Sequence, residues 1–252
     1  MNFLHTQKQR THTINPTVTG IMDTVGGHPE RIAGAIRSFM EQDYPFCKLT
    51  IFNRHPSPLI VNGIPDEWRM RLEIINDEDT YLRPVYQHMA NFKSIRTDCW
   101  IVIDDDDTME PGHISQLVTF WNNCTNRTDA PLSVCSKNYT AHYDDCSKVL
   151  SFRGWQVTLF ETLTATEVDW CFKLFPQDTM LGSDLWIASN SYYDKREFEG
   201  LPTYHWDRKG HNHVSHHETN RGVTPREQFA NVENYWRMKI AARDSVLRPV
   251  EL

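Results

Sequence analysis

The segment Trp100-Ile-Val-Ile-Asp104-Asp-Asp-Asp107-Thr-Met-Glu-Pro111 runs from a short apolar stretch straight into four consecutive carboxylates and then into a predicted helix. A wholly apolar run such as 100–103 is typical of a central strand in a sheet that is covered on both faces. In open α/β sheets, ligands bind beyond the carboxyl ends of the strands. The segment therefore predicts a ligand site that begins where this strand ends.

The four aspartates at 104–107 are the first candidates for that site. Two carboxylates about 4 Å apart repel each other by about 4 kcal/mol at an effective dielectric constant of about 20, so four of them favour a bound cation. Oxygen ligands at this density suit Mg²⁺ or Mn²⁺, which commonly bind phosphate oxygens as well. The alternative is an acidic turn that only caps the next helix. A cap needs one or two aspartates, so four of them favour the metal site.

Strand and helix signals alternate on both sides of this segment. Apolar runs predict the strands, and a periodicity of 3.6 residues predicts the helices. The predicted strands are 17–22, 47–52, 71–75 and 100–103, and the predicted helices are 29–42, 84–94 and 111–122. This βαβ rhythm implies an α/β fold whose N-terminal half contains a parallel, doubly wound sheet.

The second half of the chain is less regular. Apolar runs predict strands over 132–136 and 168–172, with aromatic-rich loops between them. A capping box, Thr224-Pro-Arg-Glu227, predicts the start of a C-terminal helix. The core face of that helix consists of Phe229, Val232, Trp236 and Ile240.

The composition narrows the classes of function. The chain carries 26 Lys and Arg against 33 Asp and Glu, which gives a formal net charge of −7 at pH 7. A protein that mainly grips a polyanion usually has the opposite sign, so nucleic acid is not the default partner. The hydrophobic fraction of 39%, with 8 Trp, 9 Tyr and 12 Phe, excludes a wholly disordered chain.

Three features bear on the location of the protein. No run of about 18 apolar residues occurs, so we expect no membrane-spanning segment. Residues 1–15 lack the apolar core of a signal peptide and are expected to form a flexible tail, followed by one domain over 16–252. The six cysteines form no C-x-x-C pair, which favours buried reduced thiols. Together these features predict a cytoplasmic protein.

The acidic segment and two other motifs resemble the family 2 glycosyltransferases of the GT-A fold. The order strand, Asp-x-Asp-Asp, Pro and helix, about 80 residues after an N-terminal strand, is similar to the family's Asp-rich motif. The segment Gly182-Ser-Asp184-Leu-Trp186 is similar to the family's Gly-Glu-Asp segment. The residues that match the family's first helix are Ile36, Ser38, Gln42 and Pro45. The resemblance implies a GT-A fold with a mostly parallel, doubly wound central sheet, a nucleotide-binding half at 16–110 and an irregular acceptor-binding half with the C-terminal helix at 111–252.

The resemblance also implies an inverting transfer of a sugar from a nucleotide-diphosphate sugar, expected to be a UDP-sugar, to an acceptor hydroxyl on a glycan or small molecule. It assigns donor contacts to Asp104 and Asp105. It assigns the divalent metal that bridges the two phosphates, Mn²⁺ or Mg²⁺, to Asp106 with support from Asp107. Asp184 corresponds to the general base, which must lie within hydrogen-bond reach of the attacking oxygen. The alternative role of Asp184 is a helix N-cap.

Five of the twelve histidines lie between residues 205 and 217. Gly210-His211 resembles the family's C-terminal loop, which places a histidine on the metal, with His213 as an open alternative. Arg208 and Lys209 would neutralise the leaving diphosphate. The alternative is a solvated, histidine-rich loop. Trp155 and Trp186 are expected to line the acceptor site, because tryptophan stacks well on sugar faces, and a core position is the alternative for Trp155.

Three features depart from the family pattern. Asn53 stands where the family usually has an aspartate that holds the nucleotide base, and an asparagine can still pair with a base edge. The first strand runs into Met22-Asp-Thr-Val-Gly-Gly-His28 where the family usually has a Pro-x-x-Asn-Arg loop. A Gln-x-x-Arg-Trp motif is absent from the sequence, which argues against a processive polysaccharide synthase.

Other functions stay open from the sequence. A nucleotidyltransferase should carry a Gly-rich basic phosphate loop after the first strand, and Val25-Gly-Gly-His28 is only a weak version of one. A non-catalytic sugar-binding module would bind the donor without turning it over. Among enzymes of this fold, the acceptor could also be a modified base in DNA, as in some phage glycosyltransferases, although the acidic net charge argues against it.

Overall fold

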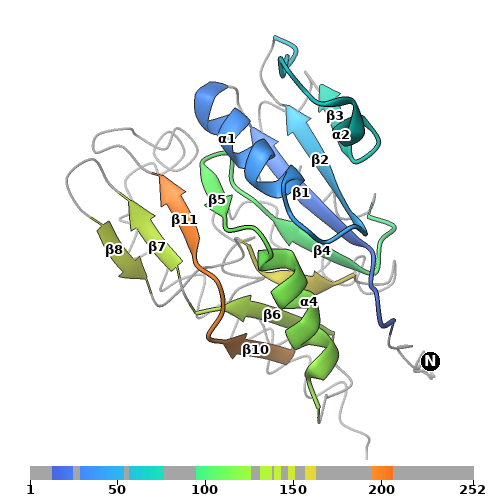
Figure 1. The fold of residues 1–252 in the computed structure, drawn as a ribbon, viewed down its shortest axis with the longest axis vertical. Coiled ribbons are helices and arrows are strands. Elements are labelled where there is room, and N and C mark those ends of the chain that lie inside the picture. The colour runs from blue at the N-terminus through green and yellow to red at the C-terminus, as the bar shows by residue number, and fades with distance from the viewer. Residues whose placement is uncertain are drawn as a thin grey trace, which may run out of the picture.

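The computed structural model describes residues 13–24, 29–53, 57–76, 95–125, 131–137, 139–142, 147–150, 157–162 and 194–206. Within these residues the main feature is a seven-stranded sheet. Its strands, in spatial order, are β10 (Asp194–Phe198), β6 (Leu132–Ser136), β9 (Leu159–Glu161), β4 (Cys99–Val102), β1 (Val18–Thr24), β2 (Cys47–Asn53) and β3 (Leu72–Asn76). β9 is antiparallel to both of its neighbours, and the other paired strands are parallel. The prediction of a mostly parallel central sheet is therefore confirmed (Figure 1).

The order β3-β2-β1-β4 makes β1 the strand from which the sheet is wound in both directions. β1 and β4 are suited to the centre of the sheet, because every residue of β4 and every residue of β1 except Asp23 is buried. Strands that are covered on both faces appear in a sequence as nearly continuous apolar runs. The strand order reverses between β1 and β4, and open α/β sheets bind their ligands at the carboxyl ends of strands beside such a reversal.

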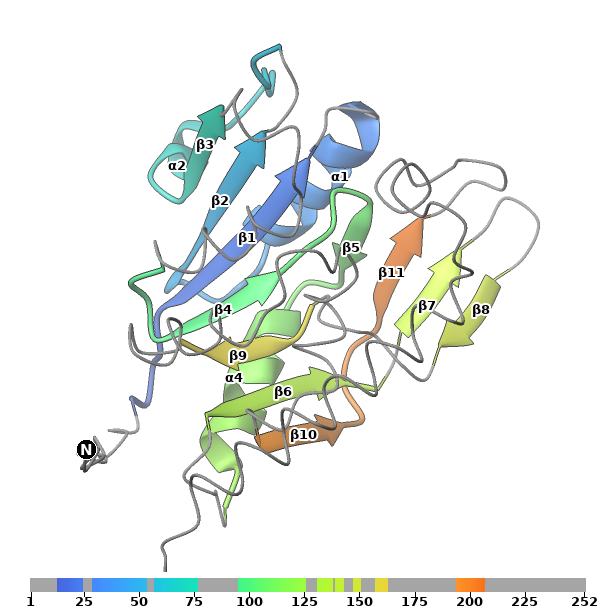
Figure 2. The ribbon, with the colours of Figure 1, turned by 180° about the vertical axis from the view of Figure 1, so that it is seen from behind.

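Two helices, α1 (Pro29–Met40) and α4 (His113–Asn123), cover the same face of the large sheet (Figures 1 and 2). In α1 the buried positions recur every three or four residues, as expected for one apolar face. These residues are Ile32, Ala35, Ile36, Phe39 and Met40. Gly20 in β1 permits the close contact, because a Cβ atom at this position would lie only 2.5 Å from the ring of Phe39.

A second sheet of four strands lies beyond the end of β4 (Figure 1). Its strands, in spatial order, are β5 (Asp107–Met109), β11 (Thr203–Trp206), β7 (Tyr139–His142) and β8 (Ser147–Leu150). β11 is antiparallel to β5 and parallel to β7, and β7 is antiparallel to β8. This sheet therefore joins a strand of the acidic segment to a strand from the last quarter of the chain.

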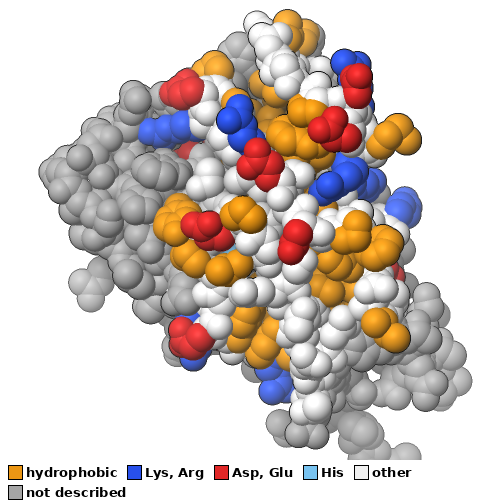
Figure 3. Space-filling view, viewed as in Figure 1, with side chains coloured by type: hydrophobic (Ala, Val, Ile, Leu, Met, Phe, Trp, Pro, Cys, Tyr) orange, Lys and Arg blue, Asp and Glu red, His pale blue; other side chains and the backbone are white. Residues whose placement is uncertain are grey.

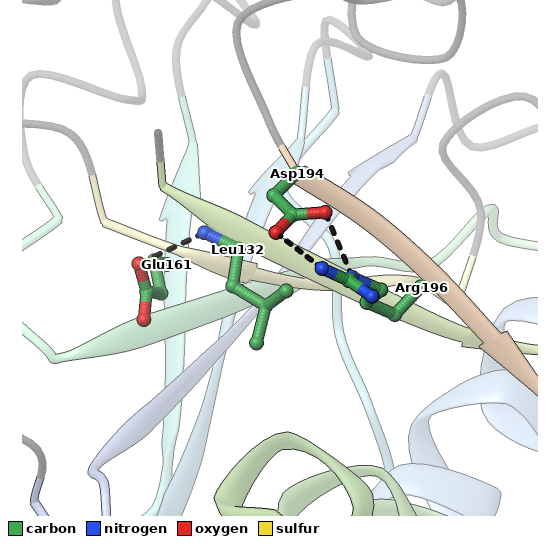
Figure 4. Close-up of polar contacts among 4 residues, drawn as sticks. All are labelled: Leu132, Glu161, Asp194 and Arg196. Carbon is green, nitrogen blue, oxygen red and sulfur yellow. Dashed lines mark hydrogen bonds and ion pairs between the residues drawn. The ribbon is translucent and has the colours of Figure 1, made fainter. Parts of the chain in front are cut away.

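Polar contacts connect the strands at the far edge of the large sheet (Figure 4). The carboxylate of the buried Glu161 in β9 accepts a hydrogen bond of 2.9 Å from the backbone N–H of Leu132, the first residue of β6. In β10, Arg196 donates two hydrogen bonds, of 2.8 and 2.9 Å, to the carboxylate of Asp194. The N–H of Asp194 donates to the carbonyl oxygen of Pro131 at 2.8 Å. The Arg196 bonds lie within β10, whereas the bonds of the Glu161 carboxylate and the Asp194 backbone align β9, β6 and β10, which are not consecutive along the chain.

The predicted strands agree with the structure wherever the structure describes them. The strand over 132–136 coincides with β6, and the first four predicted strands lie within two residues of β1 to β4. Of the predicted elements, the strand over 168–172, the helix over 84–94 and the helix that begins at Thr224 lie outside the described residues. No sequence pattern predicted the short strands of three to five residues, which are β5, β7, β8, β9, β10 and β11.

The two predicted helices in the described part correspond to α1 and α4. α4 begins at His113, two residues later than predicted, because Gly112 adopts a left-handed conformation with φ of 83° directly before it. No helix was predicted between the strands over 47–52 and 71–75, but this region contains the short helix α2 (Asp66–Arg69).

No helix in the described part of the chain is long and apolar enough to cross a membrane. Of the cysteines that the structure describes, Cys47 and Cys99 are buried, as predicted, whereas Cys124 and Cys135 are only partly buried. The division into a tail and one domain over 16–252 stays a prediction.

Candidate active site

The four aspartates of the acidic segment form one tight turn between β4 and β5, which we call the acidic turn (Asp104–Asp107). The backbone N–H of Asp107 donates a hydrogen bond of 3.1 Å to the carbonyl oxygen of Asp104. Directly before the turn, the N–H of Ile103 donates to the carbonyl oxygen of Ile21 in β1 at 2.9 Å. These bonds hold the acidic turn at the carboxyl ends of β1 and β4, between which the strand order reverses.

The aspartates of the acidic turn have different surroundings. Asp105 accepts a hydrogen bond of 2.6 Å from the hydroxyl group of Thr24, the last residue of β1. A carboxylate oxygen of Asp106 lies 3.8 Å from the Arg31 guanidinium in the first turn of α1. Asp104, Asp105 and Asp106 are partly exposed, whereas Asp107 is fully buried at the start of β5. The turn therefore presents three carboxylates near its surface and encloses the fourth.

Pairing between β5 and β11 brings a distant part of the chain to the acidic turn. The register places Met109 opposite Thr203, Thr108 opposite Tyr204 and Asp107 opposite His205. Because the strands are antiparallel, β11 runs toward Asp107 and the chain leaves this strand beside the acidic turn. Arg208 and His211 lie outside the described residues, but they follow Trp206 within five residues. The end of β11, which precedes this segment, thus lies beside the acidic turn.

Two side-chain contacts fasten β11 and the residues before it to the start of α4. The hydroxyl group of Tyr204 donates a hydrogen bond of 2.9 Å to the carboxylate of Glu110. This bond, followed by desolvation and the charge of Glu110, raises the pKa of Tyr204 above its usual value. The N–H of Leu201 donates to the side-chain oxygen of Gln116 in α4 at 3.0 Å.

Gln42, two residues after α1, connects three elements close to the acidic turn. Its buried amide nitrogen donates hydrogen bonds to the carbonyl oxygens of Ser38, at 2.9 Å, and Glu110, at 2.8 Å. Its amide oxygen accepts a hydrogen bond of 3.0 Å from the N–H of Ile114. The first N–H groups of a helix have no partner within the helix, and the N-cap residue of α4, Gly112, offers no side chain. Gln42 therefore caps α4 from outside and holds the chain just after the acidic turn.

Gln42→Leu is expected to lower the free energy of unfolding by about 1–3 kcal/mol, because an apolar side chain leaves the buried N–H of Ile114 without its acceptor. Urea unfolding followed by circular dichroism measures this change. Gln116→Leu is the matched control, since its amide lies at an exposed position and its loss should cost less than about 1 kcal/mol. A Gln42→Leu variant as stable as the control would show that α4 does not depend on this cap.

Asn53, predicted to contact the base of the donor, is the fully buried last residue of β2. Its amide nitrogen donates hydrogen bonds to the carbonyl oxygen of Ser57, at 2.9 Å, and to the side-chain oxygen of Asn76, at 2.8 Å. Both N–H groups of this amide therefore hold the chain after β2 against the end of β3. A contact with a base edge would use the amide oxygen, and this role stays a prediction.

The chain two residues after Trp155 returns to the same end of β4. The N–H of Val157 donates a hydrogen bond of 2.7 Å to the carbonyl oxygen of Val102, the last residue of β4. Val157 is fully buried and has a φ of 51°, which is rare for a β-branched residue. Strained conformations of this kind cluster at functional sites. Trp155 itself, Asp184 and Trp186 lie outside the described residues, so their predicted positions stay predictions.

The structure adds Thr24, Arg31 and Gln42 to the candidate site, where no role was predicted for them, although Gln42 is one of the residues that match the family's first helix. Thr24 is 81 residues from its partner Asp105, and Arg31 is similarly far from Asp106. A local sequence pattern contains no trace of such contacts. Gln42 follows Phe39 at the spacing of the buried face of α1, and a polar residue in that position is the signal that could have identified it.

The acidic turn suits a divalent cation that is shared with a substrate better than a complete protein cage. Among the residues that the structure describes, no three His, Cys, Asp or Glu side chains are grouped to hold a metal. Mg²⁺ in particular is usually bound by one or two carboxylates, waters and substrate phosphates. The partly exposed carboxylates at 104–106 supply such a donor set. The predicted ligands Asp106, Asp107 and His211 stay predictions.

Solved structures of S. aureus TarS, a GT-A-like glycosyltransferase, share this architecture. TarS 1–349 in complex with UDP is 14% identical, with a TM-score of 0.61 and coverage of 89% of this chain and 65% of the TarS chain. Its complex with UDP-GlcNAc is also 14% identical, with a TM-score of 0.61 over 88% and 65% of the two chains. TarS 1–349 in a further structure is 13% identical, with a TM-score of 0.56 over 75% and 60%.

No protein-family model matches the sequence, and no curated protein matches it either. The chain spans less than two thirds of the length of the TarS chains that it resembles. At this level of identity the likeness establishes the fold. The chain has a GT-A-like glycosyltransferase fold, and that prediction is confirmed.

Proposed function

We propose that the chain is a glycosyltransferase of the family 2 type, which transfers a sugar from a UDP-sugar to an acceptor hydroxyl, with inversion and with a divalent metal. The observation that carries this proposal is the acidic turn, which lies at the carboxyl ends of β1 and β4 where the strand order reverses. Open α/β sheets bind ligands at such a place. The fold shared with TarS, which is solved with UDP and UDP-GlcNAc, supports a UDP-sugar as the donor.

The diphosphate of the donor is proposed to bind at the acidic turn. Asp106, with support from Asp107, would hold Mn²⁺ or Mg²⁺, and the bound metal would stabilise the charge of the leaving diphosphate as a Lewis acid. Arg208 and His211 would add a cation and a metal ligand from the segment after β11, whose end lies beside the acidic turn.

The nucleotide part of the donor is proposed to contact Asp104, Asp105 and Asn53. All three residues lie at the carboxyl ends of neighbouring strands, since β4 pairs with β1 and β1 pairs with β2. This placement supports a single nucleotide site across three strands, because the ends of parallel strands meet at one edge of a sheet.

The acceptor is proposed to bind on the side of the turn that the second half of the chain forms. Asp184 would take the proton of the acceptor hydroxyl as that oxygen attacks the anomeric carbon and the nucleoside diphosphate leaves. Trp155 and Trp186 would stack on sugar rings. The bond between Val157 and Val102 supports a place for Trp155 near the end of β4.

The surface over α1, α2 and α4 carries acidic and basic side chains interspersed with apolar ones (Figure 3). A protein surface that grips DNA is usually dominated by Lys and Arg. The net charge of −7 favours a glycan or small-molecule acceptor over a base in DNA. A cytoplasmic location stays a prediction from the sequence.

A thermal-shift panel tests the proposal with UDP-, GDP- and TDP-sugars, each in Mn²⁺, Mg²⁺ or EDTA. A donor at 100 times its Kd adds about 2.7 kcal/mol to the apparent stability, which raises the Tm by about 5–10 °C for a domain of this size. The shift should be largest for a UDP-sugar and should vanish in EDTA. No shift with any nucleotide-sugar would contradict the proposal.

Product analysis separates the rival functions. Release of UDP in the presence of acceptors identifies the transferase, and donor binding without release identifies a sugar-binding module. Release of pyrophosphate from a nucleoside triphosphate and a sugar 1-phosphate would identify a nucleotidyltransferase instead.

A further inference from the structure

Arg31 gives the acidic turn a counter-charge from within the protein. Its guanidinium nitrogen lies 3.8 Å from a carboxylate oxygen of Asp106, and the two side chains are only 16% and 14% exposed. The residue is placed there by α1, which packs against β5, the strand that follows the acidic turn. A distance of 3.8 Å is longer than an N–H···O hydrogen bond. The two groups therefore interact as charges rather than through a direct hydrogen bond.

The positive charge of Arg31 has opposite effects on the metal and on the diphosphate that are proposed to bind at the acidic turn. A guanidinium repels a divalent cation that approaches Asp106, and it attracts the negative charges of a diphosphate. Arginine also suits both partners in shape, because its planar fork matches carboxylate and phosphate oxygens alike. The same side chain can therefore neutralise the acidic turn without a donor and contact the donor when one is bound.

We propose that Arg31 couples metal binding to donor binding. It neutralises Asp106 when no donor is present, lowers the affinity of the acidic turn for free metal, and pairs with the diphosphate of the nucleotide-sugar. This inference rests on the proposed function, because it takes a diphosphate donor at the acidic turn as given. Its consequence is that the turn binds metal and donor together much better than metal alone.

Arg31→Gln tests the proposal through two affinities that should change in opposite directions. Calorimetry with MnCl₂ alone should give a Kd at least about threefold lower than that of the wild type, because the repelling charge is gone. Calorimetry with UDP in saturating Mn²⁺ should give a Kd about tenfold higher, because a charge-assisted contact is lost. Weakened or unchanged Mn²⁺ binding would overturn the proposal, and so would unchanged UDP binding.

Two further variants separate charge from structure. Arg37→Gln is the matched control, since Arg37 lies exposed in the last turn of the same helix, and both Kd values should stay within about twofold of the wild type. Arg31→Lys keeps the charge and should keep the Mn²⁺ affinity within about twofold. Melting curves show whether each variant is folded. Arg31→Met is a second neutral variant, and its affinities for Mn²⁺ alone and for UDP with Mn²⁺ should change in the same directions as those of Arg31→Gln.

Failure of the proposed function has a different signature. A wild-type protein that binds no UDP in the presence of Mn²⁺ contradicts the proposed function, and the inference about Arg31 with it. A wild type that binds UDP with Mn²⁺, beside an Arg31→Gln variant with unchanged affinities, contradicts only the role of Arg31.

Discussion

Asp106→Ala is expected to abolish the Mn²⁺-dependent binding of a UDP-sugar and to leave the fold intact. The carboxylate of Asp106 is partly exposed in the acidic turn, so a metal can reach it without opening the core. Loss of an outer partner of a metal ligand costs about 10- to 100-fold in affinity, so loss of a ligand itself should raise the donor Kd at least about 10²-fold. Calorimetric titration of the UDP-sugar with and without Mn²⁺ measures the change.

Asp66→Ala is the matched control for this experiment. Asp66 also pairs with an arginine, Arg69, at 2.8 Å, but it lies exposed on α2. Its replacement should leave donor binding within about twofold of the wild type. A donor affinity that is equal in Asp106→Ala and Asp66→Ala would remove Asp106 from the site.

Asp184→Asn is expected to lower turnover by a factor of about 10² to 10⁴ and to retain donor binding, because it removes the oxygen that accepts the proton and keeps the shape of the side chain. Asp184 lies in Gly182-Ser-Asp184-Leu-Trp186, where the resemblance places the general base. Sugar transfer at saturating donor measures the effect. A melting curve on the same sample shows whether the variant is folded.

The Asp184→Asn variant also distinguishes a general base from a helix N-cap. Asn and Asp are nearly equivalent as helix N-caps, so an Asp184 that only caps a helix should tolerate the change with full activity. Asp178→Asn, six residues earlier, is the control for loss of a charge in the same stretch and should retain turnover. Full activity of Asp184→Asn would refute the assignment of the base.

The central strands were predictable because their signal is local. β4 is wholly apolar and buried, and β1 and β6 are almost entirely buried, as expected for strands that are covered on both faces. β5 gave no such signal, since it consists of three residues that begin with an aspartate. It exists because it pairs with β11, almost 100 residues later, and that pairing carries no periodic pattern in either segment.

The candidate site shows the same difference between local sequence signals and long-range contacts. The sequence by itself determined that four carboxylates follow a buried strand, because Asp104–Asp107 and that strand are covalent neighbours. Tertiary structure alone decided what surrounds them: Thr24 on Asp105, Arg31 beside Asp106, Gln42 behind the turn and β11 along β5. These contacts depend on strand order and on how α1 packs on the sheet, and two residues more than 60 positions apart leave no mark on each other in a single sequence.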